Sequence, residues 1–335
     1  MEPTARVLLG AALILVCGGG VTLADAAVVT ECGTTVINDT AWLEGHLDCT
    51  GLAYDGDENF FAIELVNARL ELRDFSILTT DASLGTPYNG VLCTGDCWID
   101  GPGIISGFVK GIYAHRGARV SDATIGPNRQ FGVEGLQRES AVRVRNSEVI
   151  GNGDYGILAS FVWVSDSAMV GNGWTGVSGL QRLRVRDSII EGNGHDHPYY
   201  VEPFGVSGGG DVTLVTNSVI RGNYAGVRNF AERSVLVIKD SLVEDNQASG
   251  IWSYGPTIVI DSSVSNNGGD GMISTGGFAT LRGTSVVRFN GTACSAGGPC
   301  ADVVSARRAT RAHGAECGSS LRLDRAATWS ICEDD

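Results

Sequence analysis

The chain has 335 residues, of which 38 are acidic and 24 are basic, and its formal net charge is −14. This acidic balance, together with the lack of a recognised nucleic-acid-binding module, argues against a nucleic-acid partner. Beyond the first 26 residues, no apolar run reaches the length that a membrane-spanning helix needs. A phosphate loop, a nucleophile elbow and a dinucleotide fingerprint are also missing from the sequence, so the chemistries that depend on them have no motif here.

Residues 1–26 have the pattern of an export signal. Arg6 supplies a positive charge, residues 7–16 form a short apolar segment, and a small-x-small cleavage site ends at Ala26. The mature chain is therefore predicted to begin near residue 27 and to be secreted, periplasmic or on the cell surface.

A lipoprotein anchor is the alternative fate of this leader. Cys17 is followed by three glycines, as the lipid-bearing cysteine of such a protein could be. However, Val16 is larger than the residue that usually precedes an anchored cysteine. We therefore favour cleavage and export without an anchor.

The remaining eight of the nine cysteines lie in close pairs towards the two ends of the chain. An even number of cysteines in an exported chain indicates disulfides. Sequential pairing is the simplest arrangement, although spacing alone leaves the connectivity open, and the lack of paired CxxC motifs argues against zinc. We expect two disulfide-bearing caps, at 27–60 and 294–335, to cover the open ends of a solenoid. The cysteines are Cys32, Cys49, Cys93, Cys97, Cys294, Cys300, Cys317 and Cys332.

Between these caps, residues 61–293 carry an internal repeat. Residues 142–160 and 162–180 show it most clearly: an Asp or Asn is followed six positions later by Asn, and four positions after that by a Gly-aliphatic pair. Repeats of about this length indicate coils that stack on one another. The first column is Asp122, Asn146, Asp166, Asp187, Asn217, Asp240 and Asp261; the second is Asn128, Asn152, Asn172, Asn193, Asn223, Asn246 and Asn267.

Each repeat also contains strand patterning. Val142 and Val144 alternate with Arg143 and Arg145, and this period of two predicts a strand with one buried face. The Gly-aliphatic pair is expected to begin another strand, after a turn that needs glycine. The sequence therefore predicts an all-β, single-stranded parallel β-helix in which every coil adds one strand to each of several parallel sheets.

The second column of the repeat has a physical explanation. Aligned Asn side chains in consecutive coils can hydrogen-bond amide to amide along the axis while they satisfy the backbone of the turn. With this column, residues 60–293 resemble the right-handed parallel β-helix proteins of the pectin-lyase-like superfamily. The resemblance implies the fold but no single chemistry, because that superfamily contains lyases, hydrolases, epimerases, adhesins and phage tailspikes.

One coil carries an insertion of eight residues after Gly194. It concentrates imidazoles, carboxylates and phenols, which are the groups that proton transfer on a sugar ring requires. A solvated loop that packs on the next coil is the alternative, and a metal site lacks a visible third ligand. The catalytic candidates in this insertion are His195, Asp196, His197, Tyr199 and Glu202.

Related epimerases and lyases carry an Asp-Pro-His-Asp signature. The insertion has His-Asp-His-Pro instead, which does not match, so no catalytic role is transferred. The Asp column has an explanation as a turn former, and the calcium-binding nonapeptide pattern is absent. We therefore predict no metal and no cofactor.

Basic residues gather at the outward positions of the strand that precedes the Asx column. In a parallel stack they would form a basic column, with a tryptophan between arginine-bearing coils. Pairing with Asp166, Asp187 and Asp240 is one interpretation of these charges. A binding site for a polyanion is the other, and its residues would be Arg119, Arg143, Arg145, Trp163, Arg184 and Arg186.

Two functions remain compatible with the sequence. The favoured one is an exported module that binds an acidic polysaccharide or serves in surface interactions, because the repeats are regular and no catalytic constellation is complete. The alternative is a polysaccharide-active enzyme, namely a lyase, an epimerase or a glycoside hydrolase, whose acid and base groups come from the insertion.

Overall fold

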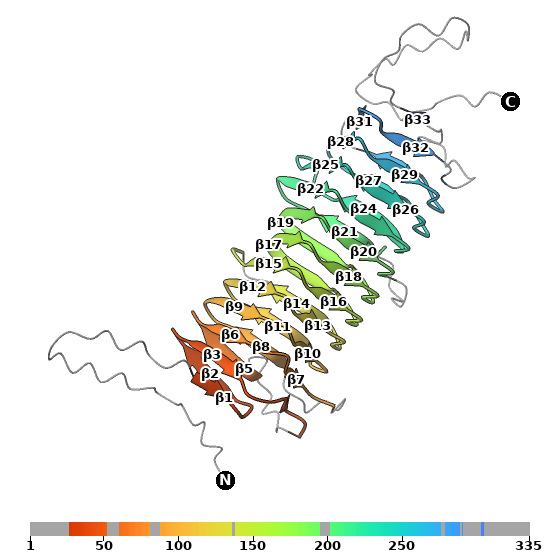
Figure 1. Ribbon diagram of the computed structural model, residues 1–335. Helices are drawn as coiled ribbons and strands as arrows, with labels where there is room; N and C mark the ends of the chain where they lie inside the picture. The colour runs from red at the N-terminus through yellow and green to blue at the C-terminus, as the bar shows by residue number, and fades with distance from the viewer. Residues whose placement is uncertain are drawn as a thin grey trace, which may run out of the picture.

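A computed structural model describes residues 27–51, 60–80, 88–135, 138–194, 202–275, 279–288 and 290, and the backbone of 303–304. The coils stack along one long axis (Figure 1), and the described residues form two sheets of 21 and 12 strands. Strands of successive coils pair in parallel; among the described strands, only residues 286–287 and 303–304 pair antiparallel. The predicted parallel β-helix is confirmed. No helix occurs in the described ranges, and none that could span a membrane.

One coil illustrates the architecture. β11 (Lys110–Ala114) leads through a short turn to β12 (Gly117–Ser121), and β13 (Thr124–Ile125) follows after a second corner. The chain then begins the next coil with β14 (Phe131–Gly135), which pairs with β11. Each coil thus contributes to three faces, which we call face 1, face 2 and face 3 in this order.

The strands are distributed over these faces as follows. Face 1 contains β2 (Thr34–Ile37), β5 (Phe61–Val66), β8 (Asn89–Cys93), β11, β14, β21 (Phe204–Gly208), β24 (Ala225–Asn229), β27 (Ile251–Ser253) and β30 (Met272–Ser274). Face 2 contains β1 (Ala27–Val29), β3 (Thr40–Leu43), β6 (Arg69–Glu71), β9 (Asp96–Asp100), β12, β15 (Ala141–Arg145), β22 (Val212–Thr216), β25 (Val235–Lys239), β28 (Thr257–Ile260) and β31 (Ala279–Arg282). The long strands β17 (Ile157–Ser165) and β19 (Val177–Arg186) pass from face 1 to face 2. Face 3 contains β4 (Leu47–Asp48), β7 (Ser76–Leu78), β10 (Ile104–Ser106), β13, β16 (Glu148–Ile150), β18 (Ala168–Val170), β20 (Ile189–Glu191), β23 (Val219–Arg221), β26 (Leu242–Glu244), β29 (Ser263–Ser265), β32 (Val286–Arg288) and β33 (Val303–Val304).

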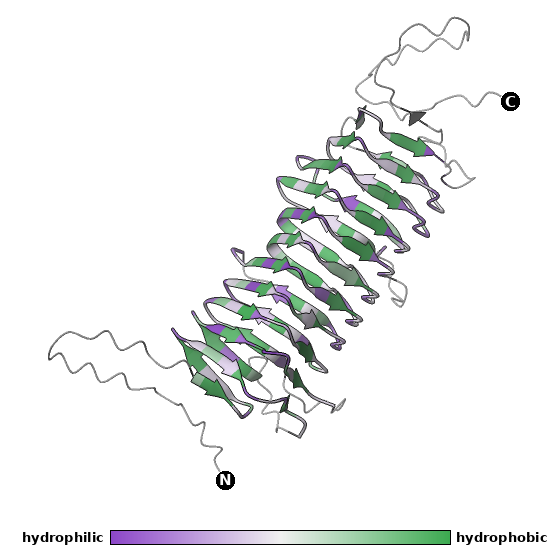
Figure 2. Ribbon diagram, in the orientation of Figure 1, coloured by the Kyte–Doolittle hydropathy of each residue, from purple (hydrophilic) through white to green (hydrophobic). Residues whose placement is uncertain are grey.

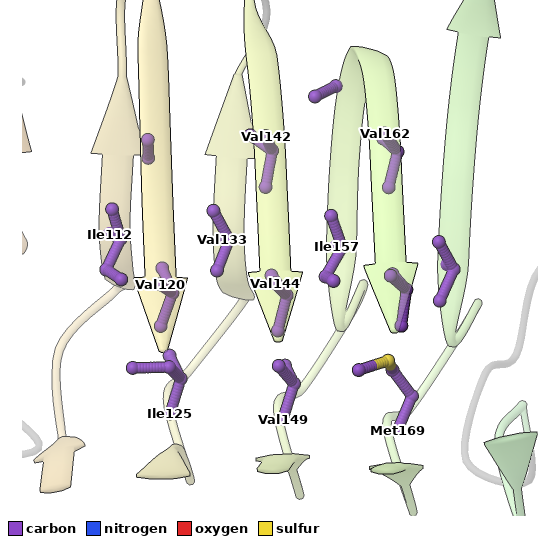
Figure 3. Packing of buried hydrophobic residues seen from close by; sticks show 14 of the residues in the cluster. Ile112, Val120, Ile125, Val133, Val142, Val144, Val149, Ile157, Val162 and Met169 are labelled. Atoms are coloured by element: carbon purple, nitrogen blue, oxygen red, sulfur yellow. The ribbon is translucent and has the colours of Figure 1, made fainter. Parts of the chain in front are cut away.

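The core is a column of aliphatic side chains inside the stack. Val142 and Val144 are buried, while Arg143 and Arg145 between and after them are exposed, as the alternation predicts. Figure 3 shows these valines in line with their counterparts in neighbouring coils, and Figure 2 shows apolar strands joined by polar corners. Burying one such side chain stabilises the fold by about 1.5–3 kcal/mol. Because each coil shares its core with two others, the coils stabilise one another.

The asparagine column forms the predicted ladder. Nδ2 of Asn152 donates to Oδ1 of Asn172 at 2.8 Å, and Nδ2 of Asn172 donates to Oδ1 of Asn193 at 2.8 Å. Each amide oxygen also accepts the backbone N–H of the preceding asparagine, as Asn172 does from Asn152 at 3.2 Å. The same contacts continue from Asn128 to Asn290.

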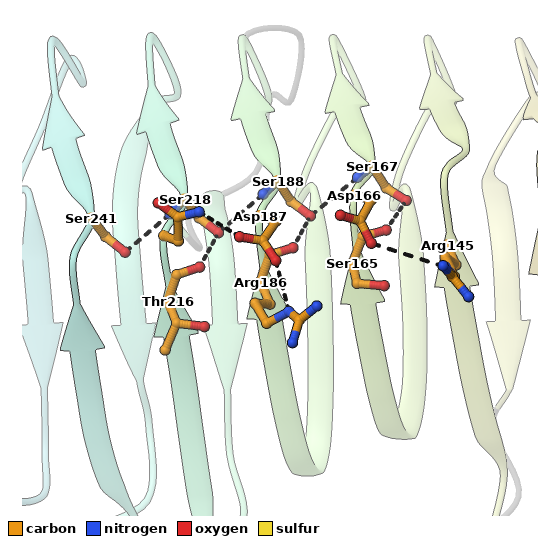
Figure 4. A network of polar contacts seen from close by, with 11 residues as sticks. Arg145, Ser165, Asp166, Ser167, Arg186, Asp187, Ser188, Thr216, Ser218 and Ser241 are labelled. Carbon is orange, nitrogen blue, oxygen red and sulfur yellow. Dashed lines mark hydrogen bonds and ion pairs between the residues drawn. The ribbon is translucent and has the colours of Figure 1, made fainter.

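The Asx column marks the corner between face 2 and face 3. All its members have φ between 46° and 58°, in the left-handed region that Asp and Asn tolerate better than other residues with a side chain. Buried serines follow most of these residues and form a second ladder that the repeat pattern had not predicted (Figure 4). Ser167 donates its backbone N–H to Oγ of Ser188 at 3.2 Å, and its own hydroxyl donates to the carbonyl of Ser165 at 2.6 Å.

The glycine column has a different cause from the one expected. Gly156 and Gly176 have no positive φ, so a turn does not require them. Instead, a Cβ at Gly156 would lie 2.5 Å from the carbonyl oxygen of Gly176 and 2.9 Å from Nδ2 of Asn172. Glycine is therefore needed because the next coil and the asparagine ladder approach too closely for any side chain.

Cysteines give a mixed outcome. Cys32 and Cys49 form a disulfide, as predicted, and the strands of this first region pair in parallel with the coils that follow. The predicted bond between Cys93 and Cys97 is wrong: both are free, buried thiols on either side of the turn between β8 and β9. They point into the core, where burial raises the pKa of the Cys93 thiol and keeps it protonated. The four cysteines beyond residue 290 lie outside the described residues, as do the leader and Cys17.

Replacing Asn172 with Ala removes one rung of the ladder at a side chain that is 1% exposed. We expect a loss of about 1–3 kcal/mol in the free energy of unfolding, because buried donors and acceptors in the adjacent coils lose their partner. Chemical denaturation measures this, with Gln130→Ala, an exposed amide, as control. Equal midpoints for both variants would contradict a stabilising ladder.

Replacing Gly156 with Ala tests the close approach of the coils. Overpacking of this kind costs about 1–3 kcal/mol, and more where backbone atoms must move. Gly45→Ala is the matched control, because a Cβ there has no atom within 4 Å. Thermal unfolding should separate the two variants, whereas a Gly156→Ala protein as stable as wild type would show that the coils can shift apart.

Candidate functional site

The predicted basic column exists on face 2. Arg119 pairs in register with Arg143, Arg143 with Trp163, and Trp163 with Arg184. The Cζ atom of Arg143 lies 4.9 Å from the ring centroid of Trp163, a cation–π contact. The structure therefore brings these four side chains together in one line, although neighbours in it are about 20 residues or more apart along the chain.

Trp98 is a member of this column that the sequence pattern did not reveal. It pairs in register with Arg119, and the Cζ atom of Arg119 lies 5.3 Å from its ring centroid. Trp98 precedes the first regular repeat, so the Asx column offered no frame in which to place it. With Trp98, the basic column consists of Trp98, Arg119, Arg143, Trp163 and Arg184.

Arg145 and Arg186 lie in a neighbouring line on the same face. Nε of Arg145 is 4.0 Å from Asp166, and Nε of Arg186 is 2.7 Å from Asp187, as Figure 4 shows. Lys239 and Asp240 form a similar pair at 3.5 Å. For this line the alternative interpretation, pairing with the Asp column, is confirmed.

The basic column itself is not neutralised in this way. Within the described ranges, no salt bridge joins Arg119, Arg143 or Arg184 to a carboxylate. All three guanidinium groups are on exposed side chains. Face 2 therefore combines a paired line of charges with an unpaired one.

A groove of about 260 Å³ lies on face 1, around the outward side chains of β17, β19, β21 and β24. Aromatic rings cover much of it: the ring centroids of Tyr155 and Trp174 are 5.0 Å apart, and Phe131 stacks on Tyr155 at 5.7 Å. Its principal lining residues are Tyr155, Trp174, Glu202, Phe204, Arg228 and Phe230. We call it the aromatic groove.

Arg228 is the cation of this groove. Its Cζ atom lies 5.3 Å from the ring of Phe204, 5.7 Å from Trp252 and 5.8 Å from Phe230. Nε of Arg228 and Nε1 of Trp252 are both buried and have no hydrogen-bond partner in the part of the chain that the structure describes. Buried donors without a partner are uncommon in folded proteins.

Tyr155 contributes a phenol beside this cation. Burial raises the pKa of Tyr155, the charge of Asp154 raises it further, and the nearby Arg228 opposes both. At neutral and mildly alkaline pH the phenol therefore stays protonated and can donate a hydrogen bond. A sequence signal for this region existed, since Phe131, Tyr155 and Phe204 each directly precede a glycine of the repeat.

The insertion returns to the fold at the aromatic groove. Its last residue, Glu202, lines the groove and is followed by β21 on face 1. His195, Asp196, His197 and Tyr199 lie outside the described residues. The one insertion residue that the structure places is thus on face 1, while the basic column is on face 2.

A buried ion pair lies further along face 1. Nζ of Lys110 is 2.5 Å from Oε2 of Glu134, and both side chains are at most 6% exposed. The ammonium also lies 3.9 Å from the ring of Tyr113 and 5.0 Å from that of Tyr88. This pair is self-contained and charge-balanced, so it supports the sheet and offers no free charge to a ligand.

No protein-family model and no curated protein matches the sequence. Among solved structures, a mutant of the periplasmic alginate epimerase AlgG is 13% identical, with a TM-score of 0.50 over 78% of this chain and 72% of the epimerase. The Dettilon tailspike protein is 12% identical, with a TM-score of 0.45 over 77% of this chain. Pectate lyase Pel9A is 14% identical, with a TM-score of 0.42 over 81% of this chain and 75% of the lyase.

These likenesses concern the fold. The chain spans about 60% of the length of the tailspike, and the sequence identities are low. The parallel register of the strands, together with the likeness to the epimerase, defines the chain as a parallel β-helix protein.

Replacing Glu134 with Ala would leave the Lys110 ammonium buried without its partner. The expected cost is about 3–5 kcal/mol of unfolding free energy. A double variant, Lys110→Met with Glu134→Leu, should recover most of it because neither charge remains. Denaturant midpoints of the three proteins decide this; a stable Glu134→Ala protein would place Lys110 in contact with solvent.

Proposed function

We propose that the protein binds an anionic polysaccharide in the aromatic groove. The observation that supports this most directly is Arg228, a partly buried cation enclosed by aromatic rings with an unsatisfied Nε. A guanidinium binds a carboxylate or sulfate through paired, charge-assisted hydrogen bonds. Arg228 is the basic residue that lines this groove, so it is the group that would select a negatively charged ligand.

The aromatic rings suit a sugar as the remainder of the ligand. Pyranose rings have an apolar face that packs on an aromatic ring, and their hydroxyls need polar partners at the rim. Tyr155 and Trp174 supply such rings, and the protonated phenol of Tyr155 is a donor in the same groove. The alginate epimerase of the same fold is named for an anionic polysaccharide, which agrees with this ligand class.

Export of the chain is part of the proposal. The leader pattern at 1–26 predicts it, and the Cys32–Cys49 disulfide is a bond typical of oxidising compartments. A secreted, periplasmic or surface location would give the groove access to polysaccharides outside the cytoplasm. Anchoring through Cys17 remains the alternative form of the same location.

Catalysis at this groove is the second candidate function. In this groove Glu202 supplies a carboxylate, which can act as a base, and Tyr155 supplies a protonated phenol, which can act as an acid. Sugar chemistry uses groups of both kinds. His195, Asp196, His197 and Tyr199 belong to the same insertion and are the further candidates. A lyase, an epimerase or a glycoside hydrolase would each need such groups.

The binding proposal is tested with Arg228→Gln. Calorimetric titration with short oligogalacturonate should show at least about tenfold weaker binding, because one charge-assisted contact is lost. Arg221→Gln is the control, since Arg221 is an exposed arginine of face 3 that pairs with Glu191 at 3.0 Å. Unchanged affinity for acidic oligosaccharides in Arg228→Gln would contradict the groove as their site.

The catalytic alternative is tested on the same polymers. Wild type is incubated with alginate and polygalacturonate while absorbance of unsaturated products, reducing ends and uronate epimerisation are followed. If turnover is found, Glu202→Gln should abolish it, and His197→Ala with Tyr199→Phe should reduce it strongly. Turnover that survives all three changes would eliminate the insertion as the catalytic centre, and no turnover with retained binding would leave a binding module.

A further inference from the structure

We propose that the basic column on face 2 is a second binding site, distinct from the aromatic groove, for an anionic polysaccharide that lies along the axis of the stack. The proposal rests on the proposed function only for the class of ligand. Its residues come from β9, β12, β15, β17 and β19, on a face to which the principal groove residues do not contribute.

The first support is the repeat geometry. Trp98, Arg119, Arg143, Trp163 and Arg184 occupy consecutive coils at the same register position. At about 4.8 Å between strands, the five side chains span about 19 Å along the axis. A linear polymer laid along this line would therefore meet one arginine or tryptophan at every coil.

The second support is energetic. Like charges in register on adjacent strands repel one another, as Arg119 and Arg143 must. In the neighbouring line, Ser165 separates Arg145 from Arg186, and each arginine lies near an aspartate. The basic column has no such carboxylates among the described residues, and only the tryptophan rings offset its charge. The positive charge of this line is therefore free to pair with an anionic ligand outside the protein.

The third support is the mixture of side chains. Arginine selects negative groups, while tryptophan offers a flat apolar surface to a sugar ring. Their combination in one line suits a polymer that carries repeated carboxylates or sulfates on rings. After Arg184 the line ends, because Leu214 and Val237 follow in register and bring no charge. At the other end Arg69 precedes Trp98 in register, but it pairs with Asp100 at 2.7 Å.

Double-stranded DNA is the competing polyanion. Its phosphates are densely spaced on two strands, so a binding protein presents a broad basic surface. Here the basic line is one residue wide, and the exposed carboxylates of the Asx column lie along the next corner. These carboxylates would repel a broad polyanion more than a narrow one. The geometry thus favours a single polysaccharide chain.

The experiment compares two variants of equal charge. Arg143→Ala with Arg184→Ala removes two unpaired arginines, whereas Arg145→Ala with Arg186→Ala removes two that pair with aspartates. Binding to immobilised polygalacturonate is measured at low and at high NaCl for both, for wild type and for Arg228→Gln. Melting temperatures are recorded for every protein, and the single changes Arg143→Gln and Arg184→Gln are used if the first double variant does not fold.

We expect the Arg143/Arg184 variant to bind at least about tenfold more weakly at low salt and to lose most of the salt dependence. The Arg145/Arg186 variant should change much less. Equal losses in both variants would show that binding depends on net charge alone and would overturn the site. Wild-type binding by the Arg143/Arg184 variant would overturn it as well. Stronger retention on DNA than on the glycan would overturn the ligand class.

The same panel separates the two sites. If Arg228→Gln abolishes binding of short oligosaccharides while the basic-column variant loses only polymer, both proposals hold. If polymer binding depends on Arg228 alone, the basic column is not a site and the groove stands. If it depends on Arg143 and Arg184 while oligosaccharides do not bind at all, the column stands and the groove proposal fails.

Discussion

The structure depends on hydrogen bonding between coils that stay in register. Each coil leaves donors and acceptors at its edges, and the next coil satisfies them through the parallel backbone ladders, the asparagine column and the serine column. A shift of one residue would turn the valines outward and the arginines inward along every affected strand. The side-chain ladders therefore do more than add stability: Oδ1 of Asn172 receives both an amide and a backbone N–H, so it holds two coils in one register.

Because the register is fixed, each outward position becomes a line of side chains along the whole stack. Face 1 and face 2 use this property differently. On face 2, arginine and tryptophan share a straight, outward-facing line. On face 1, aromatic rings from successive coils surround Arg228 in a groove beside the end of the insertion. A regular scaffold thus presents one flat basic line and one concave aromatic groove, and the two differ in charge, depth and exposure.

Neighbouring positions also show how the stack tolerates its charges. The Asx column places acidic side chains in adjacent coils, where their charges repel. A hydrogen bond from Asn146 to Asp122 lowers this repulsion at one position, and the ion pair of Arg186 with Asp187 lowers it at another. Such exposed pairs contribute about 0–1 kcal/mol each, so they neutralise repulsion more than they stabilise the fold. Lys110 and Glu134 are buried instead, where the loss of either partner would be far more costly.

The sequence by itself determined the architecture, because a repeat brings equivalent residues of successive coils together even where a loop between them is longer. The asparagine ladder, the inward valines and the line that joins Arg143, Trp163 and Arg184 all followed from that rule. Only the tertiary structure decided features that depend on distances within and between coils. It showed that Gly156 makes room for the next coil, that Cys93 and Cys97 remain thiols, and that Phe204 and Trp252 converge on Arg228. The spacing of the repeat fixes which residues align along the stack. The path of the chain around each corner fixes which of these aligned residues contact one another across coils.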